Sequence, residues 1–471
     1  MKPFKYFYTC LILFFFLSFS LNNSFAISIP EEKQVAKKFM EMVQERKMIL
    51  NDPIANHMLT RVGNHILSFL PPQPFDFSFY IVDDDIFNAF ASPGANIFAY
   101  RGLITDLDSI DELAGVIAHE IAHAVSRHVS ESIDRSKYIT LGSLAGMLAG
   151  ILIAGKSSGD AGAAMMQGTM AIGRTAMLSF TRENETEADE KGMMFLKNSC
   201  FDPKGLLSGL IKIRASDYQG VENIPDYVKT HPGTGERIGH VETILSGYVP
   251  IENKAKCPED FRFLMVKYRL LGLYAKIEPT FNLLTTQLSS NPSNNAAAAI
   301  HYGMGLIYAR KLMPEKALYH MKEALAINIF DPMVLLEMGR IYLLKGEPQK
   351  ALNVLKGIEL EPVIGLMAKL YQANAHLELG NLPESKNLFN AIIDKEPSLY
   401  PEAYYRLANI MSLEKNPGDS HYYLGVYYSK INNKKKALVH LNKALDILKD
   451  KTRIEKTKNL KKELSDQLKK R

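Results

Sequence analysis

Two histidines one helical turn apart are the residues of this chain best able to do chemistry. They are His119 and His123 in the stretch VIAHEIAHAVSRH, with Glu120 directly after the first. Because an α-helix turns about 100° per residue, positions i and i+4 face the same way, and two imidazoles there can bind one metal ion. Glu120 points slightly aside, where its carboxylate can accept a proton from a bound water. The pattern is typical of zinc hydrolases, because zinc lowers the pKa of such a water to around 7 and polarises a carbonyl group. The alternative is a helix with two partly exposed histidines.

A catalytic zinc ion needs a third protein ligand and leaves a fourth position open. His128 lies five residues beyond His123, which places it roughly 140° further round a continuous helix. Arrangements with a third histidine close by also need a glycine turn, and this segment has none. We therefore expect His128 to be a structural residue of the helix.

The segment RENETEADEKG is a better source of the third ligand. Its Glu185 and Asp189 again stand at i and i+4 of a predicted helix. One of these carboxylates can bind the metal while the other orients a ligand histidine. Glu183 and Glu187 fall on other faces of the helix, where acidic side chains are usually solvated.

The elements that position these residues can be predicted from apolar periodicity and from capping residues. Ser109 can cap the helix that carries the two histidines, and Glu112 three residues later completes a capping box. Pro93 and Gly94 are expected to join two short strands. Upstream of the histidines the pattern predicts helices over 31–50 and 54–70, a strand over 75–82 and the two short strands within 85–104.

The first 26 residues have the features of a secretory signal peptide. Lys2 and Lys5 form a positive start, residues 11–19 are apolar, and Ser24-Phe25-Ala26 is a small-x-small cleavage site. An uncleaved anchor is the alternative, but the apolar run is too short to span a bilayer comfortably. We therefore expect the chain to be exported and this segment to be removed.

A second uncharged segment, TLGSLAGMLAGILIAG, covers Thr140 to Gly155. Its sixteen residues fall short of the roughly twenty that a membrane span requires. Its glycines suit close helix packing or a mobile lid. The methionines at 165, 166, 170 and 177 that follow favour adaptable packing, with contact to a membrane or a substrate as the alternative.

Composition describes a globular protein, with 46% apolar and 23% charged residues. Removing Lys2 and Lys5 with the signal leaves 54 basic and 51 acidic residues, a balance that gives no support to nucleic-acid binding. Cys200 and Cys257 remain after export. In an oxidising compartment we expect them to form a disulfide that clamps the end of the first domain to the start of the next.

The chain from residue 262 onward repeats with a period of 34 residues. Gly305, Tyr308 and Ala317 recur as Gly339, Tyr342 and Ala351, and the register continues at Ala373 and Ser385. Gly425, Tyr428, Ala437 and Ala444 repeat the intervals of Gly305, Tyr308, Ala317 and Ala324. This period is the signature of tetratricopeptide repeats. The spacing is irregular around LEKNPGDS, and the tail after Lys449 is expected to be a basic, polar helix or a frayed end.

Four motifs in chain order resemble those of the zinc metalloproteases grouped with the CAAX prenyl proteases and HtpX. They are NAFASPG, HEIAH, Glu-x-x-Ala-Asp and THPGTGERI. The resemblance covers residues 30–245. It departs from the family pattern at Ala95, where a second glycine is common.

The resemblance implies a role for each matching residue. Glu185 would be the third zinc ligand of a single zinc ion, and Asp189 its partner outside the ligand set. His231 and Arg237 would lie near the metal and serve catalysis with Glu120. In the family this histidine can occupy the fourth zinc position and hold the enzyme latent, and the arginine helps to bind substrate or the oxyanion. The strand Asn88, Ala89, Phe90 and Ala91 would bind an extended substrate along its edge.

A secreted protease domain followed by tetratricopeptide repeats is similar to the periplasmic branch of this family, whose two domains cooperate in outer-membrane protein quality control. The expected fold is an α+β metalloprotease domain, mostly helical with a small antiparallel or mixed sheet, and then an all-α repeat array. The expected divisions are a signal peptide at 1–26, the protease domain at 27–255, the repeat domain at 262–448 and a basic polar tail at 449–471.

Two functions follow from this resemblance. The first is a periplasmic zinc endopeptidase that degrades misfolded or stalled outer-membrane proteins and assists their assembly. The second is a repeat-based chaperone or assembly adaptor in which proteolysis is accessory. The expected partners are unfolded protein substrates and, through the repeats, the outer-membrane barrel-assembly machinery, with no nucleic acid and at most peripheral membrane contact.

Overall fold

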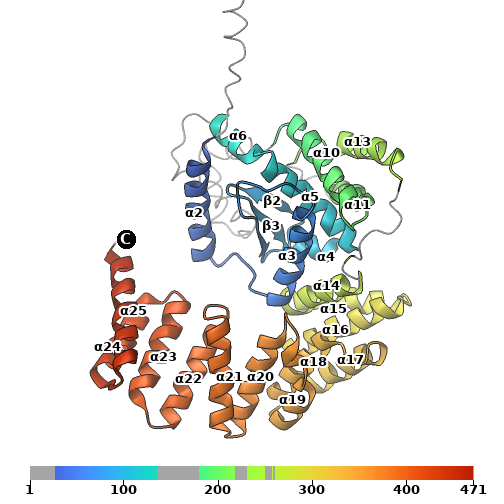
Figure 1. Cartoon of the computed structure of the whole chain (residues 1–471). Coiled ribbons are helices and arrows are strands. Elements are labelled where there is room, and N and C mark those ends of the chain that lie inside the picture. The colour runs from blue at the N-terminus through green and yellow to red at the C-terminus, as the bar shows by residue number, and fades with distance from the viewer. Residues whose placement is uncertain (1–26, 136–179, 218–230, 250–256, 258–259, 470–471) are drawn as a thin grey trace, which may run out of the picture. The chain divides into compact units, whose positions relative to one another are not determined.

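The computed structural model describes residues 27–135, 180–217, 231–249, 257 and 260–469 (Figure 1). The chain divides into two compact units, residues 1–267 and 268–471. The expected signal peptide, the uncharged segment Thr140 to Gly155 and the methionines that follow it lie outside the described residues. Among the helices of the described ranges, none combines the length and the apolar character needed to cross a bilayer.

The first unit begins with two amphipathic helices, α2 (Ile29–Glu45) and α3 (Pro53–Leu67). Ser28 and Glu31 form a capping box at the start of α2, and the Asp52 carboxylate accepts hydrogen bonds from two backbone N–H groups of α3. Both helices turn their apolar face inward and bury it. The two helices predicted from apolar periodicity are confirmed, and each ends a few residues before its predicted limit.

A three-stranded mixed sheet follows, made of β1 (Ser78–Val82), β2 (Ala89–Ser92) and β3 (Asn96–Tyr100). The strand order is β1-β3-β2, with β1 parallel and β2 antiparallel to β3. Gly94 and Ala95 form the turn between β2 and β3 with φ angles of 77° and 59°. The left-handed conformation of Ala95 explains why glycine would be easier there. β2 is an edge strand of this sheet.

The two short strands predicted within residues 85–104 are present as β2 and β3, and the second ends at Tyr100. Residues Arg101–Asp106 form the short helix α4 instead. The side chain of Arg101 pairs with Asp83 and Asp85, and the backbone N–H of Gly102 donates to the carbonyl of Asp84 at 2.9 Å. A Cβ at position 102 would lie 2.1 Å from the Asp85 carbonyl oxygen, so the chain turns here against the loop that follows β1.

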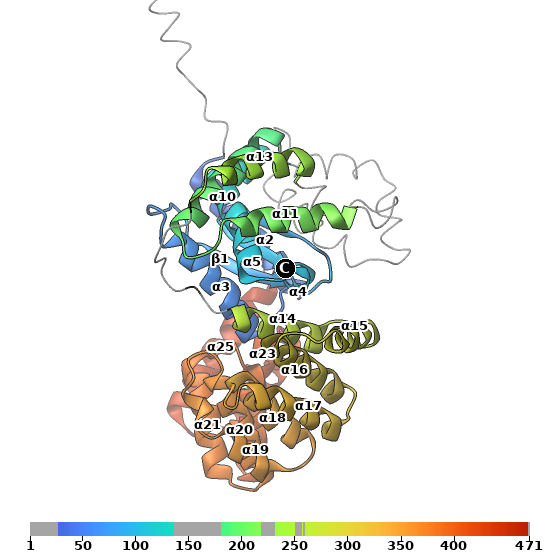
Figure 2. The ribbon, with the colours of Figure 1, turned by 90° about the vertical axis from the view of Figure 1, so that its right-hand side faces the viewer.

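Helix α5 (Ile110–Val125) forms the centre of the unit and packs against β2, β3 and α3 on one side and against α10 and α11 on another (Figures 1 and 2). The hydroxyl of Ser109 accepts from the backbone N–H of Glu112 at 3.2 Å, as expected for a cap. The predicted capping box is wrong in its second half, because the Glu112 carboxylate accepts from the backbone N–H of Asp108. The remaining helices of this part are α6 (His128–Arg135), α10 (Arg182–Asn198), α11 (Lys204–Asp217), α13 (Thr234–Ser246) and α14 (Asp260–Tyr274).

Cys200 and Cys257 form a disulfide, with their Cα atoms 5.3 Å apart. The bond closes a loop of 57 residues. It links the turn after α10 to the segment that precedes α14. The cysteine pairing predicted from the export signal and the even cysteine count is confirmed.

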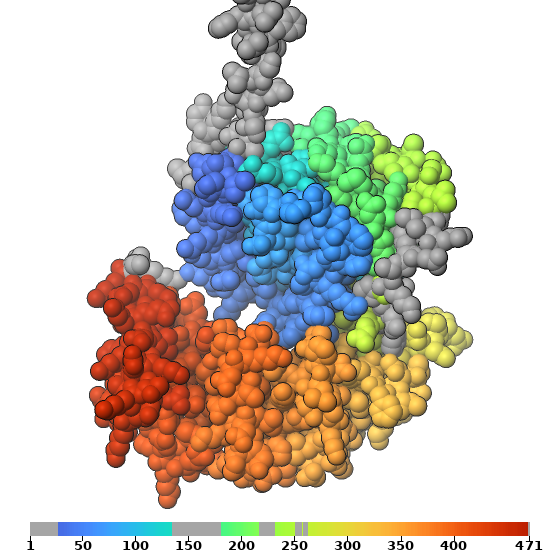
Figure 3. All heavy atoms as spheres, viewed as in Figure 1, coloured from blue at the N-terminus to red at the C-terminus, as the bar shows by residue number. Residues whose placement is uncertain are grey.

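The second unit is an array of antiparallel helix pairs (Figure 1). The colours of Figure 3 show that they follow one another in sequence order. Gly305 faces Met321 across the first pair and Gly425 faces Leu441 across a later one, and a Cβ at either glycine would clash with that partner at 2.8 and 2.5 Å. The helices are α15 (Ile277–Ser289), α16 (Asn294–Arg310), α17 (Pro314–Ile327), α18 (Pro332–Leu344), α19 (Pro348–Leu355), the 3-10 turn η1 (Ile358–Leu360), α20 (Gly365–Glu378), α21 (Leu382–Lys395), α22 (Pro401–Leu413), α23 (Pro417–Lys430), α24 (Lys434–Ile447) and α25 (Lys451–Lys469).

One extra helix explains the irregular spacing around LEKNPGDS. Helix α22 stands between the pairs α20/α21 and α23/α24, and α23 packs against both α22 and α24. It shifts the register by half a repeat, so Gly425 follows Gly305 by 120 residues, about three and a half periods. The packing still repeats at this distance: His320 stacks on Tyr308 in one pair, and His440 stacks on Tyr428 in the other. The tail is a helix, α25, which buries Leu464 against Ala437 and Leu441.

Candidate metal centre

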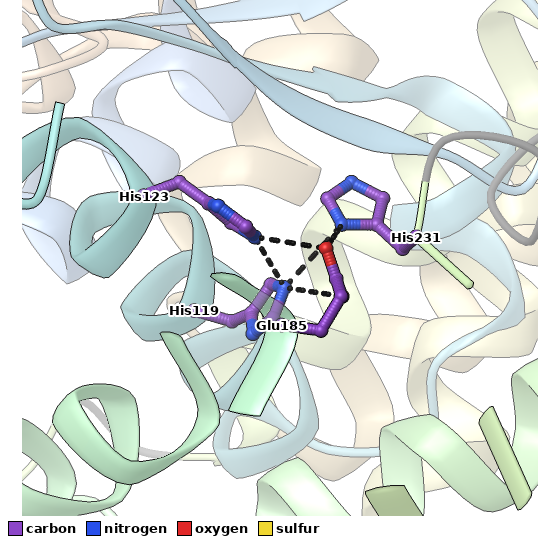
Figure 4. Close-up of side chains that lie close together, drawn as sticks. All are labelled: His119, His123, Glu185 and His231. Atoms are coloured by element: carbon purple, nitrogen blue, oxygen red, sulfur yellow. Dashed lines mark hydrogen bonds and ion pairs between the residues drawn. The ribbon is translucent and has the colours of Figure 1, made fainter. Parts of the chain in front are cut away.

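Four buried side chains converge in the first unit: His119, His123, Glu185 and His231 (Figure 4). Each offers one donor atom, and the four atoms lie within 4.8 Å of one another. All four residues are 0% exposed. No other group of three or more such residues with this geometry occurs in the described ranges.

Three elements bring these donors together. Helix α5 supplies His119 and His123 from one face, and α10 packs against it. Thr181 caps α10 and forms a capping box with Asn184, so the helix begins at Arg182. Glu185, in its first turn, lies on the face that packs against α5. His231 lies just before α13, which starts after Gly233 with a φ of 82°.

The distances between the donors fit a tetrahedral ion. Zinc bonds of about 2.0–2.1 Å would place any two ligands of a tetrahedron about 3.3 Å apart. The two imidazole Nε2 atoms of His119 and His123 are 3.0 Å apart, and His123 Nε2 is 3.3 Å from Glu185 Oε1. His231 Nδ1 is 3.0 Å from the same carboxylate oxygen and 3.4 Å from His119 Nε2. The donor set and its spacing therefore fit a zinc ion.

The far side of His119 is held by a carboxylate. Asp189 Oδ1 lies 2.8 Å from His119 Nδ1, which leaves Nε2 to face the other donors. Arg237 donates hydrogen bonds to the Asp189 carboxylate from Nε and Nη2, both at 2.8 Å. Its Nη1 lies 2.6 Å from Glu185 Oε2. One guanidinium thus orients two carboxylates of α10 at once.

The protonation of the site reflects these contacts. Burial and Arg237 disfavour the charged form of His119, but the hydrogen bond and charge of Asp189, with Glu185, outweigh them and raise its pKa to about 9. Burial and the neighbouring His119 hold the pKa of His123 well below its usual range. Burial alone would raise the pKa of Glu185, yet His231 and Arg237 hold it well below its usual value. The pocket thus favours the ionised form of the Glu185 carboxylate, which is the form that binds a metal ion.

Glu120 points into the same pocket without a hydrogen-bond partner. Both of its carboxylate oxygens are buried, and neither finds a donor within hydrogen-bond distance in the described part of the chain. Its Oε1 lies 3.6 Å from Nε2 of His231. Burial, which is the largest effect, raises the pKa of Glu120, and the charge of Glu185 acts in the same direction. A buried carboxylate in this state is suited to accept a proton from a reacting group.

Two residues, His128 and Phe180, make contacts with His123 that were not predicted from the sequence. His128 was expected to continue the helix, but α5 ends at Val125 and Arg127 adopts a φ of 58°, so His128 returns to His123. Phe180 stacks on the His123 ring with a centroid distance of 3.9 Å. No spacing rule predicted the place of His128, because it depends on the chain reversal at Arg127 rather than on helical periodicity.

The other expected site residues are placed as follows. Asp189 adjoins His119, and Arg237 is engaged by Asp189 and Glu185 with 4% of its side chain exposed. The residues Asn88 to Ala91 run into the edge strand β2, which packs against α5. Glu187, expected on a solvated face, is half exposed and contacts Ser126, His128 and Lys191.

This fold and this donor set define a metallopeptidase domain: a His-Glu-x-x-His helix, a glutamate from a second helix and a base with open hydrogen-bonding capacity. Residues 53–245 match the sequence model of Peptidase family M48, and this range contains all four donors of the site. The family resemblance carried by the four motifs is thereby confirmed.

Relatives extend the likeness into the repeat unit. The beta-barrel assembly-enhancing protease of Escherichia coli K12 is 28% identical over 378 residues, which cover 77% of this chain and 73% of that protein. Its counterpart in Yersinia pestis is 28% identical over 68% of this chain and 62% of its own length. The human mitochondrial metalloendopeptidase OMA1 is 26% identical over 38% of this chain and 34% of its own. Among solved structures, the type IV pilus biogenesis factor PilW is similar with a TM-score of 0.34 and 16% identity, over 43% of this chain and 91% of PilW.

Proposed function

We propose that this chain is a zinc endopeptidase of the periplasm that cleaves misfolded or stalled outer-membrane proteins and assists their assembly. The observation that carries the proposal is the convergence of four buried metal donors beside the buried Glu120 carboxylate, whose oxygens meet no hydrogen-bond donor among the residues that the structure describes. The substrate class and the compartment rest on the named relatives, the predicted export signal and the repeat unit.

His119, His123 and Glu185 would hold the zinc, one ion per chain. When bound, the ion would polarise the scissile carbonyl and make an adjacent water more acidic. Glu120 would take the proton from the attacking water and return it to the leaving amine. Asp189 and Arg237 would keep His119 and Glu185 in position. Since Arg237 is already engaged by two carboxylates, this orienting role agrees better with its contacts than direct binding of the oxyanion.

The substrate would bind as an added strand along β2. An edge strand offers backbone N–H and C=O groups to an extended peptide, and it reads the backbone more than the side chains. Residues Asn88 to Ala91 lead into this edge, and α5 packs directly behind β2. This mode suits unfolded proteins of varied sequence, because only a flexible segment can lie extended in the site.

The function predicts that activity depends on zinc. Treating the mature chain with a strong chelator should reduce cleavage of a fluorescent unfolded casein by more than about 100-fold, because the ligands alone cannot activate water. Adding one equivalent of zinc should restore it. Full cleavage by a chain that metal analysis shows to be free of zinc would disprove the proposal.

His231 is proposed as a latch on the fourth metal position. Its Nδ1 lies at tetrahedral distance from two of the other donors, a place that a substrate carbonyl or water must take during the reaction. It stands on the short segment before Gly233, whose left-handed φ marks a sharp turn.

Replacing His231 with alanine should therefore raise basal casein cleavage several-fold, and self-cleavage with it, while the zinc content stays at one per chain. Rates and metal content measured on the same samples test this. If His231→Ala lowers cleavage as severely as Glu120→Gln, the histidine stabilises the transition state and the latch is wrong.

A repeat-based chaperone or assembly adaptor is the second candidate function. It is favoured by large apolar side chains that stand out from the repeat unit, among them Phe330 at 81%, Leu360 at 83% and Leu312 at 79% exposure. The barrel-assembly machinery and unfolded barrel proteins are the proposed partners of this unit. A cell phenotype rescued by a Glu120→Gln chain would favour the adaptor function over proteolysis.

A further inference from the structure

The second ligand histidine, His123, has an unusual partner on the side away from the metal position. Its Nδ1 lies 2.9 Å from Nδ1 of His128. His128 is 2% exposed and starts α6, directly after the left-handed residue Arg127. The reversal at Arg127 is what brings His128 back onto the end of α5.

The other face of His128 meets an acidic residue of α10. His128 Nε2 lies 3.3 Å from Glu187 Oε2. Glu187 Oε1 accepts from Lys191 Nζ at 2.6 Å and from Ser126 Oγ at 3.1 Å, and Lys191 Nζ also reaches Ser126 Oγ at 2.8 Å. This chain of contacts therefore ends at a carboxylate that is held by hydrogen bonds from Lys191 and Ser126.

The direction of each hydrogen bond follows from the metal site. His123 directs Nε2 at His119 Nε2 and Glu185 Oε1, so its ring proton must sit on Nδ1. That proton needs an acceptor, and His128 Nδ1 is the atom in range. His128 must then carry its own proton on Nε2, which donates to Glu187. The two histidines and the carboxylate form one consistent relay.

The two ligand histidines are thus oriented by different means. His119 donates directly to the carboxylate of Asp189, whereas His123 reaches Glu187 only through a neutral imidazole. Phe180 closes one face of the His123 ring. Without His128, the Nδ1–H of His123 would be buried and would lose its acceptor, and nothing would fix which nitrogen faces the metal.

We propose that His128, anchored by Glu187, is a positioning residue that fixes the tautomer and ring orientation of His123 for metal binding. This inference rests on the proposed zinc function. The chain reversal at Arg127 then not only ends α5 but also brings His128 into contact with His123. It also predicts that a side chain able to accept from His123 and donate to Glu187 can replace the imidazole.

The test measures zinc affinity rather than activity, by competition with a chromophoric chelator. It uses the full mature chain with Glu120→Gln as the background, so that self-cleavage does not interfere. His128→Leu removes the acceptor and should weaken zinc binding 10- to 100-fold, the usual effect of losing such a partner. His128→Gln keeps an acceptor and a donor and should bind within about 3-fold of the background.

A matched control is a second histidine, on α13, that also pairs with a glutamate of α10. His240 pairs with Glu190 of α10 at 3.1 Å, but the pair is exposed and contacts none of the four donors. His240→Leu should leave zinc affinity unchanged. Glu187→Ala, at a residue 46% exposed and thus tolerant of replacement, should weaken zinc binding about 3- to 10-fold even if His128→Leu fails to fold.

Zinc binding by His128→Leu or by Glu187→Ala that equals the background would overturn the proposal, since His128 would then only fill space. Equal losses in His128→Gln and His128→Leu would also contradict it, because the hydrogen bonds would not be the cause. A background chain that binds no zinc at all is a different result: it refutes the zinc site itself rather than the role of His128.

Discussion

Glu120→Gln is expected to abolish proteolysis and to leave zinc bound. Glutamine has nearly the same shape as glutamate but cannot accept a proton at neutral pH, so the attacking water loses its base. General acid–base catalysis is worth about 10²–10⁴-fold in rate, and the kcat for casein cleavage should fall by that amount. Since Glu120 is not one of the four donors, metal analysis should still find one zinc per chain.

A control for this experiment is Glu190→Gln, which makes the same chemical change at a residue 56% exposed on α10. It should cleave casein at the wild-type rate. Cleavage by Glu120→Gln within a few-fold of wild type would show that another residue is the base.

Glu185→Gln is expected to remove the metal. The carboxylate is the only anionic donor among the four, and the neutral amide is a poor zinc ligand. The change also leaves Arg237 facing an amide with no charge at the position where Glu185 Oε2 now lies 2.6 Å away. Zinc affinity should fall by more than about 100-fold, beyond the effect of losing a partner outside the ligand set, and proteolysis should be lost with it.

Glu183→Gln is the matched control, because Glu183 is also an acidic residue in the first turn of α10 but is exposed. It should keep zinc and activity. Full zinc content in Glu185→Gln, measured on protein dialysed against a chelator buffer, would contradict the assignment and make Glu183 or Glu187 the next residue to test.

Helical periodicity explains which parts of the site could be predicted. His119 and His123, and separately Glu185 and Asp189, share a helix face because they stand at i and i+4, and the structure brings the two faces together. His128 could not be placed in this way. Its position depends on Arg127 taking a left-handed conformation, which an arginine rarely adopts and which no local pattern signals.

The fold, too, could be predicted from the sequence in some parts and not in others. Repeated glycine and tyrosine positions predicted the helix pairs, because small residues are needed where helices cross closely. The extra helix α22 was not predicted, since it adds half a repeat and moves the later signals out of phase. The short helix α4 was not predicted either, because the chain turns after β3 where the Arg101 side chain pairs with Asp83 and Asp85, residues distant in sequence.

The most direct test of the zinc site is a crystal structure of the zinc-loaded mature chain, with anomalous data collected on both sides of the zinc absorption edge. We expect one zinc peak per chain within about 2.2 Å of His119 Nε2, His123 Nε2 and an oxygen of Glu185, with His231 Nδ1 or a water as the fourth ligand. A zinc peak that lies elsewhere, or a site in which Glu185 stays with Arg237 and does not reach the metal, would contradict this account.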